Sequence, residues 1–227
     1  MIYFPEMARG RHPTRIYIDP PDPQVAEKYF RYWYGGDIIR EPDRFPSLTS
    51  TDLFGNDNPL EIDFGCGIGM LACNRAEQNS HINMLGIDVS QKPLFCAINY
   101  ANTRGLDNVK FIRSNFNALL PLLKPGTVRT AYYLFPNPPH DYFHQRANTG
   151  RKRFLETIYT SLVFDGGRFI FATDSRDFFQ CIKNIIETDL HYVNSEFDIE
   201  YAGISTWYRS FWESRGKDVL GIVVKKV

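Results

Sequence analysis

The feature that most constrains the fold is a glycine-rich turn directly after a short apolar strand. Residues 60–64 read Leu-Glu-Ile-Asp-Phe, and residues 65–69 read Gly-Cys-Gly-Ile-Gly. Glycines at alternate positions let the backbone turn sharply and approach a bound ligand closely. A buried strand that enters such a turn and continues into a helix is typical of an open α/β sheet. We therefore expect a ligand at the carboxyl edge of this strand.

Strand and helix patterns then alternate along the chain, which predicts a parallel sheet. We expect an α/β protein with a Rossmann-like, seven-stranded, mostly parallel sheet and helices on both faces. The length of 227 residues suits one such domain with additions. The predicted strands cover residues 60–64, 82–88, 109–113, 128–135, 168–173, 191–201 and 219–226, and the main predicted helices cover residues 68–78, 92–104, 151–163 and 178–187.

The first 58 residues differ in character from the rest. Residues 1–22 hold four prolines and scattered arginines, which indicates an irregular arm. A helix is predicted over residues 23–34, with a proline at its start and a Gly-Gly pair as its stop. Its aromatic side chains belong either to the core or to a lid over a substrate. We expect residues 1–58 to form an arm, a helix and a connector, and residues 59–227 to form the ligand-binding domain.

Polar side chains surround the glycine turn. Asp63 lies just before it, where a carboxylate repels a pyrophosphate and favours a cationic, amino-acid-like group. Asp88 ends the next predicted strand, about 20 residues after the glycines, where a carboxylate can bond both hydroxyls of a ribose. Asn115 follows the third strand, at a position suited to contact the amino group of an adenine. These features favour a cationic adenosine compound over a dinucleotide.

Six stretches, in this order along the chain, carry a resemblance to a known family. They are LEIDFGCGIG, LGIDVS, the stretch from Asn108 to Asn115, YLFPNPP, the stretch from Gly166 to Asp174, and Thr206 before the last strand. With them the chain resembles class I S-adenosylmethionine-dependent methyltransferases, and more narrowly the tRNA (guanine-N7) methyltransferase family. The resemblance implies S-adenosyl-L-methionine as the cofactor, and a substrate site made by the Pro-Asn-Pro loop, Asp174 and Thr206. The implied cofactor contacts are Glu61, Gly65, Gly67 and Asp88.

The fourth strand ends in a proline-rich loop at the ligand-binding edge of the sheet, residues 135–140. The prolines hold the backbone rigid, so the side-chain oxygen of Asn137 can accept a hydrogen bond from an attacking amine and orient its nitrogen. Asp174, after the fifth strand, can orient the nucleophile or accept its proton. These two are the predicted catalytic residues. We also assign Phe135 to cofactor binding, and Pro138, His140, Thr206, Arg209, Tyr29 and Tyr32 to substrate binding.

Two positions of the predicted substrate site differ from the family pattern. Asn137 stands where the family usually has an aspartate, and Arg209 stands where it has a glutamate. An arginine cannot accept the hydrogen bonds that guanine donates. The chain also carries 26 basic and 26 acidic side chains, so no overall charge attracts RNA. We therefore expect N-methylation of a small acceptor, namely a heterocycle, an amine or a nucleoside-like metabolite.

Three alternatives stay open. The acceptor can be tRNA, as in the tRNA (guanine-N7) methyltransferases. The cofactor's own amino group can instead attack its side chain, which cyclises S-adenosylmethionine and releases methylthioadenosine. The chain can also bind the cofactor without turnover, although its glycine turn and Asp88 speak against a loss of binding.

No pattern in the sequence indicates a membrane or a metal. No apolar run approaches the ~20 residues that cross a bilayer, and the N-terminus lacks the apolar region of a secretory signal. We therefore expect a cytoplasmic protein without a membrane partner. The five histidines show no ligand-like spacing, so no metal site is predicted. The oligomeric state stays open.

Overall fold

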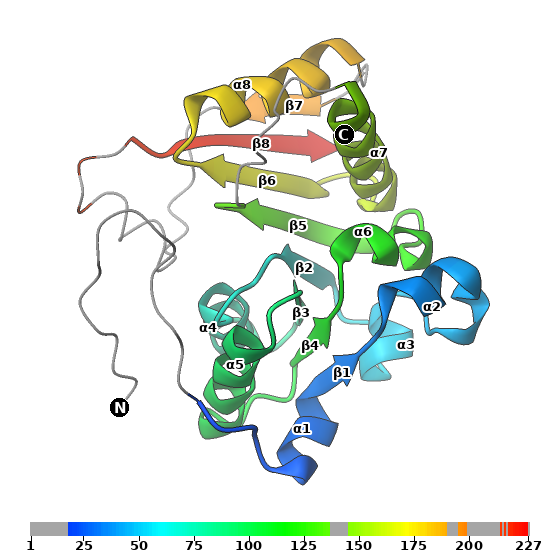
Figure 1. The fold of residues 1–227 in the computed structure, drawn as a ribbon, viewed down its shortest axis with the longest axis vertical. Helices are drawn as coiled ribbons and strands as arrows, with labels where there is room; N and C mark the ends of the chain where they lie inside the picture. The colour runs from blue at the N-terminus through cyan, green and yellow to red at the C-terminus, as the bar shows by residue number, and fades with distance from the viewer. Residues whose placement is uncertain are drawn as a thin grey trace.

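The computed structural model describes residues 18–136, 145–189, 195–198, 214, 216 and 218–226. Within these residues, one sheet of eight strands runs in the order β1-β4-β3-β2-β5-β6-β8-β7 (Figure 1). Strands β1 to β6 pair in parallel, whereas β8 is antiparallel to both β6 and β7. The mostly parallel sheet predicted from the sequence is confirmed. The strands are β1 (Phe30–Tyr32), β2 (Leu60–Phe64), β3 (Asn83–Asp88), β4 (Val109–Arg113), β5 (Val128–Leu134), β6 (Arg168–Thr173), β7 (Ser195–Asp198) and β8 (Leu220–Lys226).

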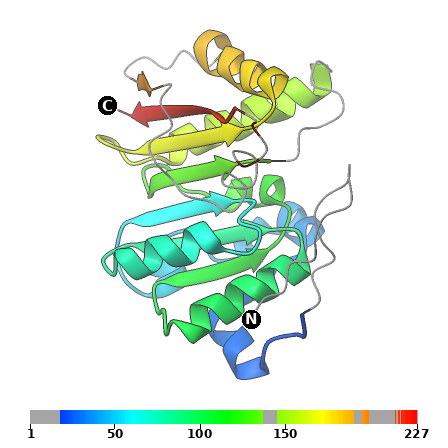
Figure 2. The ribbon, with the colours of Figure 1, turned by 90° about the vertical axis from the view of Figure 1, so that its left-hand side faces the viewer.

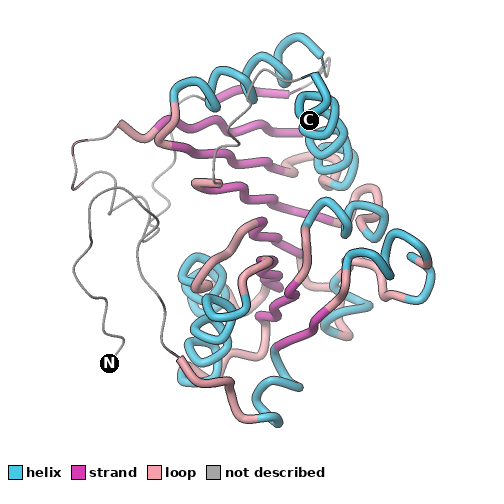
Figure 3. The backbone as a smooth tube through the Cα atoms, in the orientation of Figure 1, coloured by secondary structure: helices cyan, strands magenta, loops and turns pink. Residues whose placement is uncertain are grey.

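Helices cover both faces of this sheet and alternate with its strands (Figure 3). Helices α1, α4 and α5 pack on one face, where α4 and α5 lie across the sheet in Figure 2. Helices α6, α7 and α8 supply apolar side chains to the core on the other face. The helices are α1 (Pro23–Tyr29), α2 (Gly35–Arg40), α3 (Ser50–Phe54), α4 (Met70–Gln78), α5 (Gln91–Thr103), α6 (Phe116–Leu119), α7 (Gln145–Ser161) and α8 (Arg176–Asn184), with short 3-10 turns at Pro42–Arg44 and Leu120–Leu122 and a π-helical turn at Ile185–Asp189. Among the helices described, none is both long and apolar enough to cross a bilayer.

Strand β2 is the central strand that positions the site, because it pairs with β3 on one side and β5 on the other. All five of its residues are buried. Its apolar side chains at positions 60, 62 and 64 enter the core beneath α6 and α7. Successive side chains on a strand point to opposite faces, so Glu61 and Asp63 face α4 and α5. The alternation therefore buries two carboxylates on one face of the sheet.

The N-terminal helix is shorter than predicted. Helix α1 ends at Tyr29, and the next three residues form β1, which pairs in parallel with β4 through Phe30 opposite Phe111. Prediction of a helix through residue 34 was wrong because pairing with the open edge of β4 outweighs the local helical pattern. Gly35 begins α2 instead of ending the first helix, and the predicted connector holds α2 and α3. The sheet consequently gains an eighth strand from a segment that was predicted to be helical.

The helix predicted over residues 151–163 begins earlier in the structure, and this changes the position of three basic residues at 151–153. Helix α7 begins at Gln145, so this run lies inside the helix rather than at its start. The Arg151 guanidinium lies 5.8 Å from the centroid of the Phe178 ring on α8, and its Nη1 donates to Cys181 Sγ at 3.6 Å. Arg151 therefore joins α7 to α8.

Candidate cofactor and substrate site

The glycine turn between β2 and α4 has the backbone form that its sequence demands. Gly65, Gly67 and Gly69 have φ values of 85°, 54° and 73°, a region that strains side chains with a Cβ. Among the described residues, no atom lies within 4 Å of the position that a Cβ would take at Gly65 or Gly67. A Cβ at Gly69 would lie 2.5 Å from that of Ala97 on α5. The first two glycines therefore line open space for a ligand, and the third allows α4 and α5 to pack closely.

Asp88 fixes this turn against the end of β3. Its Oδ2 accepts a hydrogen bond from the backbone N–H of Gly67 at 2.9 Å, and its Oδ1 accepts from the N–H of Ser90 at 2.7 Å. A carboxylate offers about four acceptor sites, so two remain for a ligand. The predicted ribose-binding carboxylate and the glycine turn thus lie in contact at the carboxyl edge of neighbouring strands.

Asp63 supplies a buried carboxyl directly below the turn. Asp63 is only 4% exposed. This burial raises the pKa of its carboxyl from 3.8 to about 7, and the charge of Asp88 makes a smaller contribution in the same direction. A cation placed beside it favours the ionised form. This environment suits the positively charged amino acid end of S-adenosylmethionine, which is the group predicted for this side of the turn.

Asp63→Asn is expected to stabilise the protein without ligand at alkaline pH. Between the unfolded pKa of 3.8 and the folded pKa of about 7, the folded state holds a proton that the unfolded chain releases, so stability falls as pH rises through this window. Above about pH 7 the full cost is present, up to about 4 kcal/mol at 1.36 kcal/mol per pKa unit. Urea unfolding at pH 5 and pH 8 measures it.

The stabilisation by Asp63→Asn should be larger at pH 8 than at pH 5. Asp107→Asn is the matched control, because the side chain of Asp107 is 85% exposed. Equal effects of Asp63→Asn at both pH values would show that the carboxyl is already ionised in the folded protein at pH 5.

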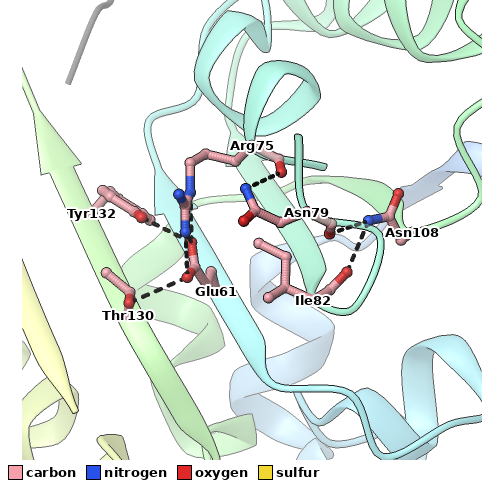
Figure 4. A network of polar contacts seen from close by, with 7 residues as sticks. All are labelled: Glu61, Arg75, Asn79, Ile82, Asn108, Thr130 and Tyr132. Carbon is pink, nitrogen blue, oxygen red and sulfur yellow. Dashed lines mark hydrogen bonds and ion pairs between the residues drawn. The ribbon is translucent and has the colours of Figure 1, made fainter. Parts of the chain in front are cut away.

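Glu61 was predicted to contact the cofactor, but its carboxylate lies in a closed internal network (Figure 4). Arg75 on α4 donates to both carboxylate oxygens, with Nη2 2.8 Å from Oε1 and Nε 3.1 Å from Oε2. Tyr132 on β5 donates its hydroxyl to Oε2 at 2.8 Å, and burial together with Glu61 raises the pKa of that hydroxyl. Glu61 therefore ties β2 to α4 and β5, and a cofactor contact by its side chain would have to displace one of these bonds.

Asn115 caps the N-terminus of α6, where its Oδ1 accepts a hydrogen bond from the N–H of Asn117 at 3.0 Å. The residue lines a cavity of about 350 Å³ next to the ends of β3 and β4. Val89 and Ser114 also line this cavity, and neither was predicted as a site residue. Val89 could have been predicted, because it is an apolar residue directly after Asp88. The predicted adenine contact thus lies on the wall of a real cavity.

Phe135 follows β5 directly and has a strained backbone conformation. Its φ of 49° is unusual for a bulky residue, and its N–H donates to the carbonyl of Ala172 on β6 at 2.7 Å. Such strain is typical of functional turns. Asp174 follows β6 and is partly buried, so the parallel pairing of β5 and β6 brings both residues to the same edge of the sheet. The remaining predicted residues of this part, Asn137, Pro138, His140, Thr206 and Arg209, lie outside the described residues.

The two tyrosines assigned to substrate binding have separate environments. Tyr29 is 1% exposed and donates its hydroxyl to the carbonyl of Leu106 at 2.8 Å, which makes it a core residue near the start of β4. Its assignment to the substrate site is therefore corrected, because the start of a parallel strand is the edge opposite the site. Tyr32 is exposed and lines the same cavity as Asn115.

Comparisons with known proteins extend along nearly the whole chain. A family model described as a putative methyltransferase matches residues 57–221. The tRNA (guanine-N(7)-)-methyltransferase of Chloroherpeton thalassium is 31% identical over 222 residues, which is 96% of this chain and 98% of that protein. A protein of the same name from Rubrobacter xylanophilus is 33% identical over 209 residues, covering 90% and 93% of the two chains.

The fold is also similar to that of solved methyltransferases. The crystal structure of the aminoglycoside resistance methyltransferase NpmB1 matches with a TM-score of 0.56 and 20% identity, covering 80% of this chain and 95% of that one. At this identity the match shows a shared fold.

Proposed function

Since the chain belongs to the tRNA (guanine-N7)-methyltransferase family of S-adenosylmethionine-dependent methyltransferases, we propose that it methylates N7 of a guanine in tRNA. The observation that carries the proposal is a sequence identity of 31% to a relative with this name, in an alignment that covers 98% of that relative's length. This full-length match outweighs the two substitutions and the balanced charge that favoured a small heterocycle, amine or metabolite.

The chemistry of this acceptor changes what the site residues have to do. The cofactor supplies an electrophilic methyl group on its sulfonium. Guanine N7 carries a lone pair and no proton, so its methylation needs no base and leaves a positive charge on the purine. Oxygen acceptors near the purine stabilise that charge as it develops. We therefore assign Asn137 and Asp174 to charge stabilisation and orientation rather than to proton removal.

The overall charge of zero leaves tRNA binding to local basic side chains. In the run at 151–153 on α7, Arg153 is exposed and Lys152 is partly exposed. Both side chains are suited to contact phosphates. Arg151 is excluded from this role because it packs on α8.

The test of the proposed function compares three incubations of the purified protein with S-adenosylmethionine. One contains the cofactor alone, one contains tRNA that lacks the modification, and one contains guanosine and small nitrogen heterocycles. Mass spectrometry should detect adenosylhomocysteine together with 7-methylguanosine in digested tRNA in the second incubation alone. Methylthioadenosine without an acceptor would support cyclisation of the cofactor, and a methylated heterocycle without methylated tRNA would support the small acceptor. Either result rejects the proposal.

Asn137→Ala is expected to lower kcat for tRNA methylation about 100-fold, because it removes a preorganised acceptor beside the reacting base. The dissociation constant of adenosylhomocysteine should change less than threefold, which is set as the limit for a residue that does not hold the cofactor. Single-turnover rates and calorimetric titration give the two values. Asn137→Asp is the matched variant, since it restores the usual residue of the family and should keep most activity. A parallel loss of rate and cofactor affinity would reject the assignment.

A further inference from the structure

Exposed apolar side chains gather at one place on the described surface. Four of the five large exposed hydrophobic residues among the described positions are Tyr32, Tyr34, Ile39 and Val89. All four line the cavity of about 350 Å³ beside Asn115. Single exposed apolar residues are ordinary, but a cluster around a cavity marks a binding site. The cluster therefore calls for a ligand with an apolar surface.

The pairing of β1 with β4 explains how these residues meet. Tyr32 lies opposite Arg113 in the sheet, and the N–H of Trp33 donates to the carbonyl of Arg113 at 3.2 Å. The residues after β1 consequently lie beside those after β4, and α2 packs against α6 (Figure 1). Val89, next to Asp88 at the end of β3, completes the cavity. The cavity thus adjoins the predicted ribose-binding carboxylate.

The polar groups of this cavity favour a neutral, flat ligand. Its charged side chain is Arg113, whose guanidinium lies 5.0 Å from the Tyr32 ring centroid and donates to the carbonyl of Val89 and to Gln91 Oε1, each at 3.2 Å. Arg113 is therefore already occupied. The Oγ of Ser114 is buried and has no hydrogen-bond partner among the described residues. A heterocycle with ring nitrogens suits both features.

We propose that residues 32–39, which lie before the stretch matched by the family model, form the outer wall of the adenine pocket of the cofactor site. Tyr34 and Ile39 cover one side of the purine, and Val89 covers the base from the side of the ribose. The N-terminal segment thereby contributes to cofactor affinity. This inference rests on the cofactor of the enzyme and not on tRNA as its acceptor.

Gly36 offers a way to move the Tyr34 ring without removing it. A Cβ at Gly36 would lie 2.7 Å from Cε1 of Tyr34, the far end of a side chain that can rotate away. Gly36 lies inside α2, where alanine is a better helix former than glycine. Gly36→Ala should therefore keep or raise the melting temperature while it displaces the ring. A loss of affinity in this variant cannot come from unfolding.

The test is calorimetric titration of the variants with adenosylhomocysteine and with methylthioadenosine, which has the adenosine but no amino acid end. Tyr34→Ala and Ile39→Ser should each weaken both ligands by about tenfold, the scale of losing a stacked aromatic or a buried apolar contact. Gly36→Ala should weaken both by about threefold or more, since stacking depends on ring position. Phe164→Ala is the control, because Phe164 is exposed and does not line this cavity.

Wild-type affinity of Tyr34→Ala and Ile39→Ser for both ligands would overturn the inference. A loss of tRNA affinity with unchanged adenosylhomocysteine affinity would overturn it too, because the cluster would then contact RNA. Failure of the wild-type protein to methylate tRNA leaves these titrations unaffected, so the inference and the proposed function fail separately.

Discussion

Glu61→Ala is expected to destabilise the folded protein by about 3–5 kcal/mol, the usual cost of removing one partner from a buried ion pair. The side chain of Glu61 is 1% exposed, whereas that of Arg75 is 29% exposed. The substitution leaves the guanidinium of Arg75 and the hydroxyl of Tyr132 without their shared acceptor. Urea unfolding at pH 7 should show a lower midpoint with the same slope.

A surface ion pair of the same type provides the control. Arg104 and Glu77 lie 3.1 Å apart with exposures of 28% and 52%, so Glu77→Ala should cost no more than about 1 kcal/mol. Replacing both Glu61 and Arg75 by methionine should recover much of the loss, because no buried charge is left alone. If Glu61→Ala costs as little as Glu77→Ala, the network does not hold the strands together.

Glu61→Gln separates the structural role of Glu61 from the predicted cofactor contact. Glutamine keeps the size of the side chain and one acceptor oxygen, so most molecules of this variant should be folded at low temperature. If Glu61 acts only within the network, the folded variant should bind adenosylhomocysteine as the wild type does. A tenfold loss of affinity in protein shown to be folded would restore the contact implied by the family resemblance.

Asp88→Ala is expected to weaken adenosylhomocysteine about 100-fold. Two charge-assisted hydrogen bonds to ribose hydroxyls, at about 1.5–3 kcal/mol each, account for at least this loss. The substitution also removes the acceptor that holds the N–H of Gly67 at 2.9 Å, so the turn loses its support. Calorimetric titration measures the affinity, and a melting curve confirms that the variant is folded.

Asp88→Asn should give an intermediate loss of affinity, since an amide keeps one acceptor oxygen but not the charge. Asp107→Ala is the control, because Asp107 is exposed and pairs with Lys28 away from the site. If Asp88→Ala binds adenosylhomocysteine as tightly as the wild type does, the cofactor's ribose lies elsewhere. The proposed adenine pocket beside Asp88 would then be wrong as well.

The glycine turn and the carboxylate of Asp88 beside it could be predicted from the sequence because they are encoded locally. Alternating glycines after β2 and an acidic residue at the end of β3 determine a turn and a carboxylate that parallel pairing must bring together. The same holds for β4 and β6, whose bounds agree with the prediction at both ends. Short-range sequence patterns are sufficient to predict a structural feature that is formed by one strand and the turn that follows it.

Contacts between distant segments could not be predicted in this way. Glu61 resembles a cofactor ligand in the sequence, but its partners Arg75 and Tyr132 lie 14 and 71 residues further along the chain. The choice of acceptor has a related difficulty: single differences such as Asn137 favour a small acceptor, but they do not report how the whole chain is related to other proteins, and that relation supports the proposal of tRNA.

The sequence by itself determined the α/β fold, the glycine turn and the position of Asp88, because alternation, turn chemistry and strand order act over short distances. Only the tertiary structure decided that Tyr29 belongs to the core, that β1 extends the sheet beside β4, and that Tyr34 and Ile39 border the same cavity as Asn115. The physical reason is that β4 forms its edge hydrogen bonds with a segment about 80 residues earlier in the chain. No local sequence pattern indicates which strand edge a short aromatic segment will pair with.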